Sequence, residues 1–354
     1  MKFQFCLCIL FVCKFSFSQV VLNADGPGNT YALINSVFAP GYNVVEAPDC
    51  SHTEFGNHID EIFDNDLNTN VFRFFIHTTP DNDRCIKFDR QRNEIKTYDK
   101  SPDNLKGVEG ELVIYKWKFK LESGFQSSSS FTHLHQLKSV GGDLASMPMY
   151  TLTTRKGSPD QLELRYAETD KQITLLKQDL TPFIGVWLNV TETISYGTSG
   201  SYEIEINKDS DGTSLFTYAN NSIVNWRHEA SFVRPKWGIY RSLNNAQDLR
   251  DEQVLFADFS IEESDLMSVN DIKAAEVSFA IKPNPIRDEF YVSEIPKNAS
   301  SIEIFTMDGR NVLKQTVDNR KEVKLDVSSF ADGTYVLSVV LKEQVQSKLI
   351  VISK

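Results

Sequence analysis

Beyond its first residues, the chain lacks any apolar run long enough to cross a membrane. It begins MKFQFCLCILFVCKFSFSQ, with an early lysine, an apolar stretch and small residues at Ser16 and Ser18. A spanning helix needs about 20 apolar residues, and this stretch is shorter and is interrupted by Lys14. The pattern is typical of a secretory signal, so we expect cleavage near Ser18 and a soluble, secreted protein.

Cysteine is also scarce once the signal is removed. Three of the five cysteines, Cys6, Cys8 and Cys13, lie in the signal, which leaves Cys50 and Cys85. Two cysteines in an oxidising compartment are expected to form one disulfide, and two free buried thiols are the alternative. A cysteine-based metal site needs more ligands than these two.

Positive charge is in deficit. The formal net charge is −11, and loss of Lys2 and Lys14 with the signal, which contains no acid, changes it to −13. An acidic protein repels polyanions at long range, which argues against nucleic acid as a partner. Binding of an anionic substrate would therefore need basic residues concentrated in one place.

Helical periodicity is scarce, and its clearest case is residues 58–63. Strand patterns recur instead, in stretches such as LVIYKWKFKL, QLELRYAE and VWLNVTETISY, which are separated by turn residues such as KDSDGTS. Many alternating strands in one domain predict an all-β fold, a β-sandwich of the jelly-roll type.

The strand pattern is interrupted after residue 263. The stretch SDLMSVNDIKAAEVS, residues 264–278, is typical of a linker, and a new strand-rich unit follows it. The predicted organisation is a signal over residues 1–18, a jelly-roll domain over 19–263, a linker over 264–278 and a small β-sandwich over 279–354. We expect the chemistry to lie in residues 19–263.

The last unit contains three short motifs in a defined order along the chain. They are Pro283-Asn284-Pro285, then IFTMDGRNVLK, then DGTYVL. This unit resembles the C-terminal sorting domain that Bacteroidetes use for type IX secretion. The resemblance implies recognition by that secretion machinery, an extracellular or cell-surface location, and removal of the domain. A small immunoglobulin-like domain that binds carbohydrate is the alternative.

Polar residues gather on single faces of two predicted strands. Because side chains alternate along a strand, the stretch DRQRNEIKTY has one face made of Arg90, Arg92, Glu94 and Lys96. In MYTLTTRKG the corresponding face contains Thr151, Thr153 and Arg155. A solvated face with weak salt bridges is the alternative for each strand.

The stretch FTHLHQLKS contains a His-x-His pair. Alternation places His133 and His135 on one face, between the apolar Phe131 and Leu137, and it places Gln136 and Lys138 on the other face. The polarity of the Gln136/Lys138 face is the feature that needs an explanation. Two such histidines could bind zinc with a third ligand, but the other histidines show no metal-ligand spacing: His52, His58, His77 and His228. We therefore interpret His133 and His135 as hydrogen-bonded core residues.

The stretch KWGIYRS contains a glycine within a strand pattern. Lys236, Gly238 and Tyr240 share one face, and Trp237 begins the other. A strand glycine leaves room for close approach to the backbone, so Gly238 could support a sugar ring that Tyr240 reaches at its edge. A buried, hydrogen-bonded tyrosine or a bulge glycine is the alternative.

Three short motifs carry a resemblance of the main domain. Arg92-Asn93-Glu94-Ile95, Gln136-Leu137-Lys138 and Lys236-Trp237-Gly238-Ile239-Tyr240 are similar to strand motifs of jelly-roll polysaccharide lyases of the alginate-lyase type. Those motifs are Arg-x-Glu-Leu, Gln-Ile-His and Lys-Ala-Gly-x-Tyr, in the same order. Lys138 stands at the histidine position, which leaves the catalytic base open.

Longer stretches resemble one family more closely, the ulvan lyases of polysaccharide lyase family 28. They include ADGPGNTYALINS, DRQRNEIKTYDKSPDNLKG and LTTRKGSPDQLELRY. The resemblance implies a secreted, endo-acting lyase that cleaves the sulfated algal polymer ulvan at a uronic acid by β-elimination. The products would carry a 4,5-unsaturated sugar.

The resemblance also implies roles for the residues. Arg92 and Gln136 would neutralise the uronate carboxylate, with Arg155, Lys236 and His135 as further substrate-binding residues. Tyr240 is the candidate acid.

The base is open between three schemes. Lys138 could serve if Arg92 and Lys236 depress its pKa. Alternatively, Lys138 stays cationic and a Tyr240 phenolate acts as both base and acid. His133 or His135 is the third candidate.

A structural calcium ion is a further expectation, since jelly-roll carbohydrate proteins often hold one through oxygen ligands. Asp25, Glu46 and Asp258 are its candidate ligands, and ordinary surface acids are the alternative. We expect no cofactor for the chemistry and a monomeric chain.

Two other functions compete with ulvan lyase. One is a lyase that acts on glucuronan or alginate, and the other is a non-catalytic carbohydrate-binding module. A glycoside hydrolase needs two facing carboxylates, and the candidate strands supply only Glu94.

Overall fold

The computed structural model describes residues 18–265, 279–306, 310–317, 320–341 and 345–354. The predicted signal, apart from Ser18, and nearly all of the predicted linker lie outside these residues. The chain divides into two compact units, Met1–Met267 and Ser268–Lys354. Each unit is described by itself below.

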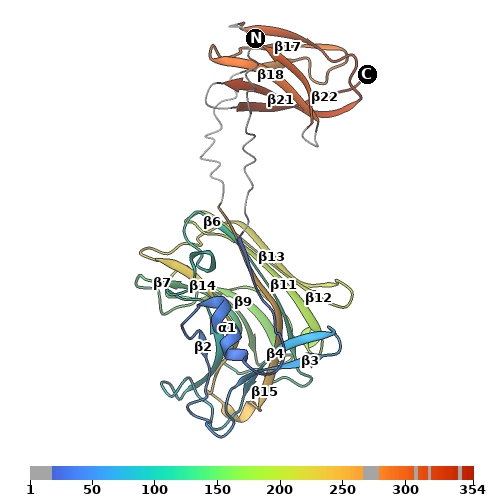
Figure 1. Ribbon diagram of the computed structural model, residues 1–354. Helices are drawn as coiled ribbons and strands as arrows, with labels where there is room; N and C mark the ends of the chain where they lie inside the picture. Colours follow the sequence, from blue (N-terminus) through green and yellow to red (C-terminus); the bar gives the residue numbers. More distant parts are fainter. Residues whose placement is uncertain (1–17, 266–278, 307–309, 318–319, 342–344) are drawn as a thin grey trace, which may run out of the picture. The chain divides into compact units, whose positions relative to one another are not determined.

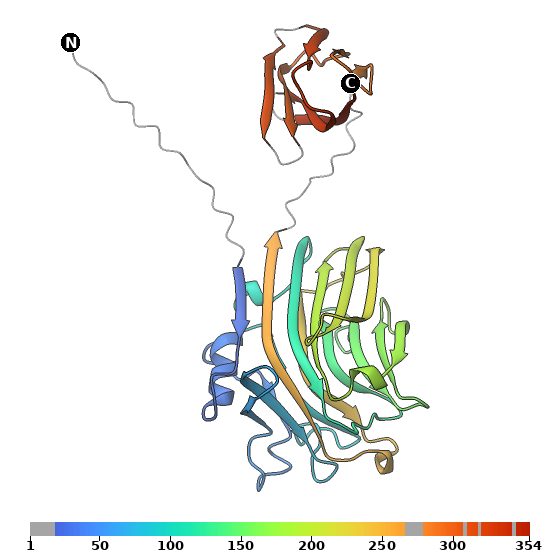
Figure 2. The ribbon, with the colours of Figure 1, turned by 90° about the vertical axis from the view of Figure 1, so that its right-hand side faces the viewer.

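The first unit is built from two antiparallel sheets (Figures 1 and 2). Sheet A contains β1 (Ser18–Leu22), β3 (Ile59–Asp64), β4 (Thr69–Ile76), β6 (Glu111–Leu121), β11 (Trp187–Ser195), β12 (Gly200–Lys208), β13 (Ser214–Ile223) and β15 (Glu252–Asp265). Sheet B contains β2 (Val45–Glu46), β5 (Arg90–Lys96), β7 (Thr132–Val140), β8 (Tyr150–Arg155), β9 (Gln161–Tyr166), β10 (Ile173–Asp179) and β14 (Phe232–Ser242).

The chain passes repeatedly from one sheet to the other. Sheet A has the order β13-β12-β11-β6-β15-β4-β3, with β1 paired to β15, and sheet B has the order β10-β9-β8-β7-β14-β5-β2. Strands that are neighbours in a sheet are thus often distant in sequence, as β5 and β14 are. The predicted all-β sandwich of the jelly-roll type is confirmed.

One continuous apolar core lies between the two sheets. Trp117 and Phe119 of sheet A and Trp237 and Ile239 of sheet B are all buried in it. The rings of Trp117 and Trp237 lie 5.9 Å apart between centroids. Alternation along β14 therefore turns Trp237 inward and leaves Lys236 and Tyr240 on the opposite face of sheet B.

The helix prediction was wrong in its position. Residues 58–63 fall largely in strand β3, and the α-helix within the described residues is α1 (Thr30–Phe38). Its buried residues Thr30, Ile34 and Phe38 recur every four positions, which is the spacing of one helix face. Single turns of 3-10 helix also occur at Asp103–Leu105, Thr181–Phe183 and Ala246–Asp248.

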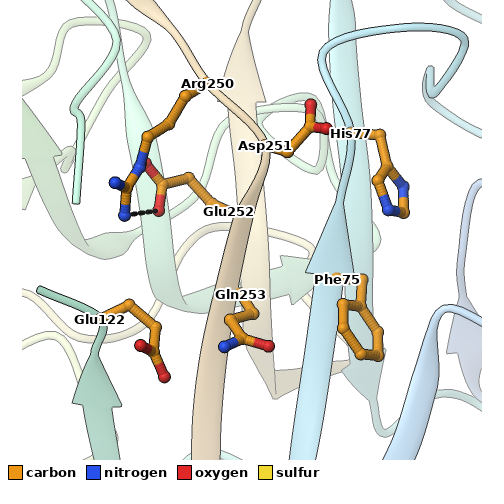
Figure 3. A pocket seen from close by; sticks show the side chains of 7 residues that line it. All are labelled: Phe75, His77, Glu122, Arg250, Asp251, Glu252 and Gln253. Carbon is orange, nitrogen blue, oxygen red and sulfur yellow. Dashed lines mark hydrogen bonds and ion pairs between the residues drawn. The ribbon is translucent and has the colours of Figure 1, made fainter. Parts of the chain in front are cut away.

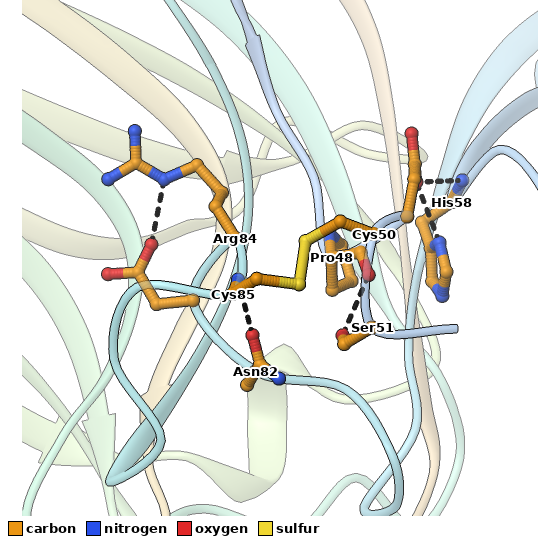
Figure 4. The surroundings of a disulfide bond; sticks show 9 residues. Pro48, Cys50, Ser51, His58, Asn82, Arg84 and Cys85 are labelled. Atoms are coloured by element: carbon orange, nitrogen blue, oxygen red, sulfur yellow. Dashed lines mark hydrogen bonds and ion pairs between the residues drawn. A yellow bond between two sulfur atoms is a disulfide. The ribbon is translucent and has the colours of Figure 1, made fainter. Parts of the chain in front are cut away.

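The predicted disulfide between Cys50 and Cys85 is present, with their Cα atoms 6.2 Å apart (Figure 4). It joins the segment that precedes β3 to the loop that precedes β5. In that loop the side chain of Asn82 accepts a hydrogen bond from the backbone N–H of Cys85 at 2.7 Å. The bond thus fixes a loop beside the first charged strand of sheet B.

The second unit has a separate core between two smaller sheets. One has the order β16-β17-β20 and the other β19-β18-β21-β22. Their strands are β16 (Ala280–Lys282), β17 (Glu289–Ser293), β18 (Ala299–Thr306), β19 (Asn311–Thr316), β20 (Glu322–Asp326), β21 (Gly333–Leu341) and β22 (Val345–Ile352). Phe290, Ile304 and Leu337 lie in the core of this unit.

Membrane-spanning helices were sought in the described part of both units. None of the helices there is long and apolar enough to cross a bilayer.

Candidate active site

Strands β5 and β14 place the predicted site residues on one face of sheet B. Their register sets Tyr240 opposite Arg92, Gly238 opposite Glu94, and Lys236 opposite Lys96. On the other side of β14, strand β7 sets Gln136 opposite Lys236. Residues that are directly opposite in a sheet share a face, so three distant segments meet on the face that is turned away from the core.

Glu94 is the centre of the contacts on this face. Its carboxylate is 1 % exposed and accepts hydrogen bonds from Lys236 Nζ at 2.8 Å, from Arg92 Nη1 and from Gln136 Nε2. Burial alone would raise the pKa of Glu94, but the cationic Lys236 and Arg92 outweigh it and lower the pKa to about 2. Glu94 is therefore a permanent anion here.

Glu46 of β2 forms a second centre beside it. Its carboxylate accepts hydrogen bonds from Arg84 Nη1 and Lys96 Nζ, both at 2.7 Å, and from Lys236 Nζ. Burial opposes ionisation, yet Lys236, Lys96 and Arg92 hold the pKa of Glu46 far below its usual range. The carboxylate of Glu46 thus contacts three side-chain cations.

The charged residues on this face form one connected group, which we call the Glu46–Glu94 network. It contains Glu46, Asp83, Glu94, Arg84, Arg92, Lys96 and Lys236. Four cations face three acids, a net charge of +1, and the neighbouring Lys138 and Arg234 bring it to +3. The acidic chain thus has the local positive charge that an anionic substrate requires.

Two guanidinium groups contact Tyr240. Arg90 Nη1 donates a hydrogen bond to the phenol oxygen at 3.0 Å. The guanidinium carbon of Arg92 lies 3.6 Å from the ring centroid, and Arg92 Nε is held by Asp83 at 3.0 Å. Any negative charge that develops on the phenol oxygen would be stabilised by these two cations.

Lys138 is the cation of this face that differs from the others. Among residues 18–263 no hydrogen bond or ion pair of its ammonium group is present, whereas Lys96 and Lys236 each contact Glu46. Burial, and then the cationic Lys236, Arg234 and Arg92, lower the pKa of Lys138 to about 8. Its Cα lies opposite that of Arg234 on β14. Its ammonium group nevertheless lies close enough to Arg92, which packs on the ring of Tyr240, for the two charges to interact.

His133 lies on this face, contrary to its predicted place in the core. The register of β7 shifts between His133 and His135 with respect to β8, and the alternation is broken at Leu134. His133 is therefore opposite Tyr240, with 5.8 Å between ring centroids. Burial lowers the pKa of His133 to about 3, and within the described residues its buried Nδ1 has no hydrogen-bond partner.

His135 has the core position predicted from the alternation, so its expected substrate-binding role is wrong. It is 1 % exposed, its Nε2 lies 2.8 Å from Glu192 Oε2, and its ring lies 4.4 Å from that of Trp117. A residue enclosed between the sheets can neither bind the polymer nor act as its base.

The role expected for Gly238 also needs correction. Its φ is +145°, and a Cβ at this position would lie 2.1 Å from the carbonyl oxygen of Asn93 and 2.8 Å from Glu94 Cα. The space that glycine leaves is filled by the backbone of β5. Gly238 is thus required for strand pairing and does not support a sugar ring.

Arg155 lies at the edge of this region. It ends β8, is half-buried, and its Nε lies 3.2 Å from the carboxylate of Glu163. Its charge contributes to the low pKa of His133. Arg155 is therefore near the Tyr240 end of the face, where His133 lies.

The three acids predicted to bind calcium are not brought together. Asp25 is exposed, Glu46 belongs to the network, and Asp258 is bonded to Lys118 at 3.0 Å. Within the described residues, the group of side chains that could share a metal ion consists of His52, His58, His77 and Asp81. Its three histidines had been judged to lack metal-ligand spacing, and that judgement is corrected below.

Replacement of Glu94 by glutamine tests the network's contribution to stability. We expect Glu94→Gln to lower the free energy of unfolding by about 3–5 kcal/mol, since it leaves Lys236 and Arg92 with less compensating charge in a buried place. Urea unfolding at pH 7 measures the change. Because Glu94 has a pKa of about 2 against 4.5 unfolded, the difference should shrink as the pH falls below about 4.5.

The control for this test is Glu205→Gln, at an exposed position of β12. It should change the free energy of unfolding by less than about 0.5 kcal/mol. Equal effects of both substitutions would show that the Glu46–Glu94 network contributes no special stability.

Comparison with protein-family models concerns the second unit. The model described as the secretion system C-terminal sorting domain matches residues 280–353. The second unit is a sorting domain. The protein is therefore secreted to the extracellular space or held at the cell surface, as its three ordered motifs predicted.

Comparison with solved structures concerns the first unit. An endo-β-1,4-glucuronan lyase from the fungus Trichoderma reesei is 16 % identical, with a TM-score of 0.41, and the match covers 57 % of this chain and 85 % of that one. A marine alginate lyase of polysaccharide lyase family 14 from Aplysia kurodai is 14 % identical, with a TM-score of 0.47 and coverages of 69 % and 98 %.

A family 7 alginate lyase in complex with its substrate is 15 % identical, with a TM-score of 0.44 and coverages of 63 % and 92 %. These names concern glucuronan and alginate, so the expectation of ulvan stays a prediction. In a search of curated proteins, no sequence matched the chain.

Proposed function

We propose that the first unit is a secreted polysaccharide lyase that cleaves a uronic-acid polymer by β-elimination, with ulvan as its substrate. The observation that carries the proposal is the arrangement around Tyr240. A phenol contacted by Arg90 and Arg92 shares a net positive face with Lys138, a cation without an acid partner on that face. Export by the sorting domain would bring this face to polymers outside the cell.

Lys138 is the residue that binds the uronate carboxylate in this proposal. The proton at C5 is weakly acidic because the adjacent carboxylate is already negative, and a cation there stabilises the enolate-like intermediate. A bound carboxylate would itself favour the charged form of Lys138. The side-chain amide of Gln136 has two hydrogens. One is donated to Glu94, and the other would be donated to the uronate carboxylate.

Arg92 has a different role from the one the resemblance implies. Its guanidinium is already bonded to Asp83 and Glu94 and packs on the ring of Tyr240. It therefore supports Tyr240 in place of binding the substrate carboxylate. Breaking its two acid contacts to bind a third would forfeit buried ion pairs.

Tyr240 transfers the proton. Its phenolate form takes the hydrogen from C5, the electrons of that bond form the C4–C5 double bond, and the bond from C4 to the glycosidic oxygen breaks. The phenol then returns the proton to the departing oxygen, so the enzyme ends in its starting state. This scheme fits proton and leaving group on the same side of the ring, and it uses no cofactor.

Incubation of the purified protein with ulvan, glucuronan and alginate tests the proposed activity. We expect ultraviolet absorbance from the C4–C5 double bond to rise fastest with ulvan and to accompany a rapid fall in viscosity, as endo cleavage requires. A faster rise with glucuronan or alginate would identify that polymer, and not ulvan, as the preferred substrate. Binding of all three polymers without unsaturated ends would identify a carbohydrate-binding module and refute the lyase.

A further inference from the structure

Three histidines surround the buried carboxylate of Asp81, next to the core side of strand β5. Asp81 Oδ1 lies 3.0 Å from His52 Nδ1 and 3.2 Å from His58 Nε2, and Asp81 Oδ2 lies 3.1 Å from His77 Nδ1. One ligand atom from each of the four residues lies within 4.8 Å of all the others. His58 and Asp81 are almost fully buried.

The pairing of β3 with β4 explains why these residues meet. His58 immediately precedes β3 and His77 immediately follows β4, and these two strands are antiparallel neighbours. The backbone N–H of Phe75 donates to the carbonyl oxygen of His58 at 2.9 Å. His52 and His58 come from the segment before β3, and His77 and Asp81 come from the segment after β4. The sequence alone does not show that these two segments meet.

Asp49 supplies a second, independent observation. It lies 2.8 Å from His58 Nδ1, while the other ring nitrogen of His58 faces Asp81. Metal-binding histidines usually donate their second N–H to a carboxylate, which fixes the tautomer and orients the ring. Asp49 is itself oriented by the hydroxyl of Tyr31 at 2.9 Å.

We propose that His52, His58, His77 and Asp81 bind one Zn²⁺ ion as a structural site. Three imidazole nitrogens and one carboxylate oxygen are a ligand set that suits zinc, and four protein ligands complete its preferred tetrahedral coordination. The set does not suit calcium, which takes six to eight oxygen ligands. The site is separate from Tyr240 and Lys138.

A pocket lies beside His77, one of the four proposed ligands. It has a volume of about 230 Å³ and is lined by residues that include Phe75, His77, Glu122, Asp251 and Glu252 (Figure 3). Arg250 also lines it and pairs with Glu252. Three acids against one cation give its lining a net charge of −2, which attracts a cation.

The zinc site would hold the loop that leads into β5. Asp81 is a ligand, Asp83 two residues later holds Arg92, and Cys85 forms the disulfide to Cys50 beside His58 (Figure 4). Gln91 and Asn93, on the core side of β5, donate to the carbonyl oxygens of Asp81 and His58. Metal and disulfide together would thus position the strand that carries Arg92.

Titration of the chelator-treated full chain with zinc chloride tests the site. We expect one zinc per chain with a Kd on the order of 1 µM or tighter. At a free zinc concentration a hundred times the Kd, the melting temperature should rise by about 5–10 °C. Cobalt(II), used as a probe, should give the intense visible absorption of tetrahedral coordination.

His52→Gln is the variant of choice because His52 is partly exposed, so its loss should be tolerated by the fold. It should weaken zinc binding at least 100-fold and abolish the shift in melting temperature. The control is His228→Gln, whose ring is 92 % exposed and outside the cluster, and it should bind zinc as the parent does.

Three results would overturn the site, and none depends on the lyase activity. One is a folded chain that binds no zinc. Another is zinc binding of equal strength in His52→Gln and in the parent. A rise in melting temperature with calcium but not with zinc would overturn it as well.

Discussion

Tyr240→Phe should lower kcat/KM for release of unsaturated product by about 10²–10⁴-fold, the usual contribution of a proton-transferring side chain. Phenylalanine keeps the ring on which Arg92 packs, 3.6 Å from its centroid, and removes only the oxygen that Arg90 contacts at 3.0 Å. The substitution therefore removes the proton carrier with little change in packing. The ultraviolet absorbance of the C4–C5 double bond measures the rate, and thermal unfolding checks the fold.

Tyr42→Phe is the matched control, because Tyr42 is 50 % exposed and its ring packs against Tyr98 and not against Arg90 or Arg92. It should leave both kcat/KM and the melting temperature unchanged. If Tyr240→Phe kept its rate within a few-fold of the parent, Tyr240 would not transfer the proton, and His133, whose ring lies 5.8 Å away, would become the candidate.

The sequence predicted the β5 and β14 half of the site well because both strands alternate without interruption. Their register remains regular from Lys236 to Ser242, so counting by two placed Arg92, Glu94, Lys236 and Tyr240 on one face. The same counting cannot tell how far a face is covered. A solvated face was the alternative for the charged strand β5, and the face is in fact buried, with Glu94 only 1 % exposed.

The prediction for β7 was incomplete because a bulge is a property of strand pairing. The irregularity at Leu134 arises between β7 and its neighbours β8 and β14, and nothing in FTHLHQLKS marks it, since no glycine or proline is present. One displaced residue moves His133 from the core to the face of Tyr240 and leaves His135 inside. Alternation is reliable only within an uninterrupted register.

The histidine cluster shows a second limit of sequence reasoning. Metal-ligand spacing is recognisable when ligands lie on one element, but His52, His58, His77 and Asp81 are brought together by the β3–β4 pair and by the loop that follows it. The same holds for Glu46, a candidate calcium ligand in the sequence, because its partners Lys96 and Lys236 are distant from it along the chain. Such groups become visible only once the sheet order is known.

Deprotonation of Lys138 should cause kcat/KM to fall at alkaline pH. The ammonium form binds the uronate carboxylate in the proposed mechanism, and the pKa of Lys138 is lowered to about 8. The charged form predominates below that pH and is lost above it, so kcat/KM, which reports the free enzyme, should fall as the pH rises through about 8. Lys138→Met should lower kcat/KM at least 100-fold at pH 7, because the carboxylate loses its cation.

Lys138→Arg distinguishes the two possible roles of this residue, binding of the uronate carboxylate and abstraction of the proton. Arginine keeps the positive charge to far higher pH, so the variant should retain measurable activity, and its alkaline limb near pH 8 should disappear. A base would behave in the opposite way. Activity would rise with pH through about 8, because only the neutral amine accepts a proton, and Lys138→Arg would be as inactive as Lys138→Met. That pair of results would assign proton abstraction to Lys138 and leave Tyr240 as the acid alone.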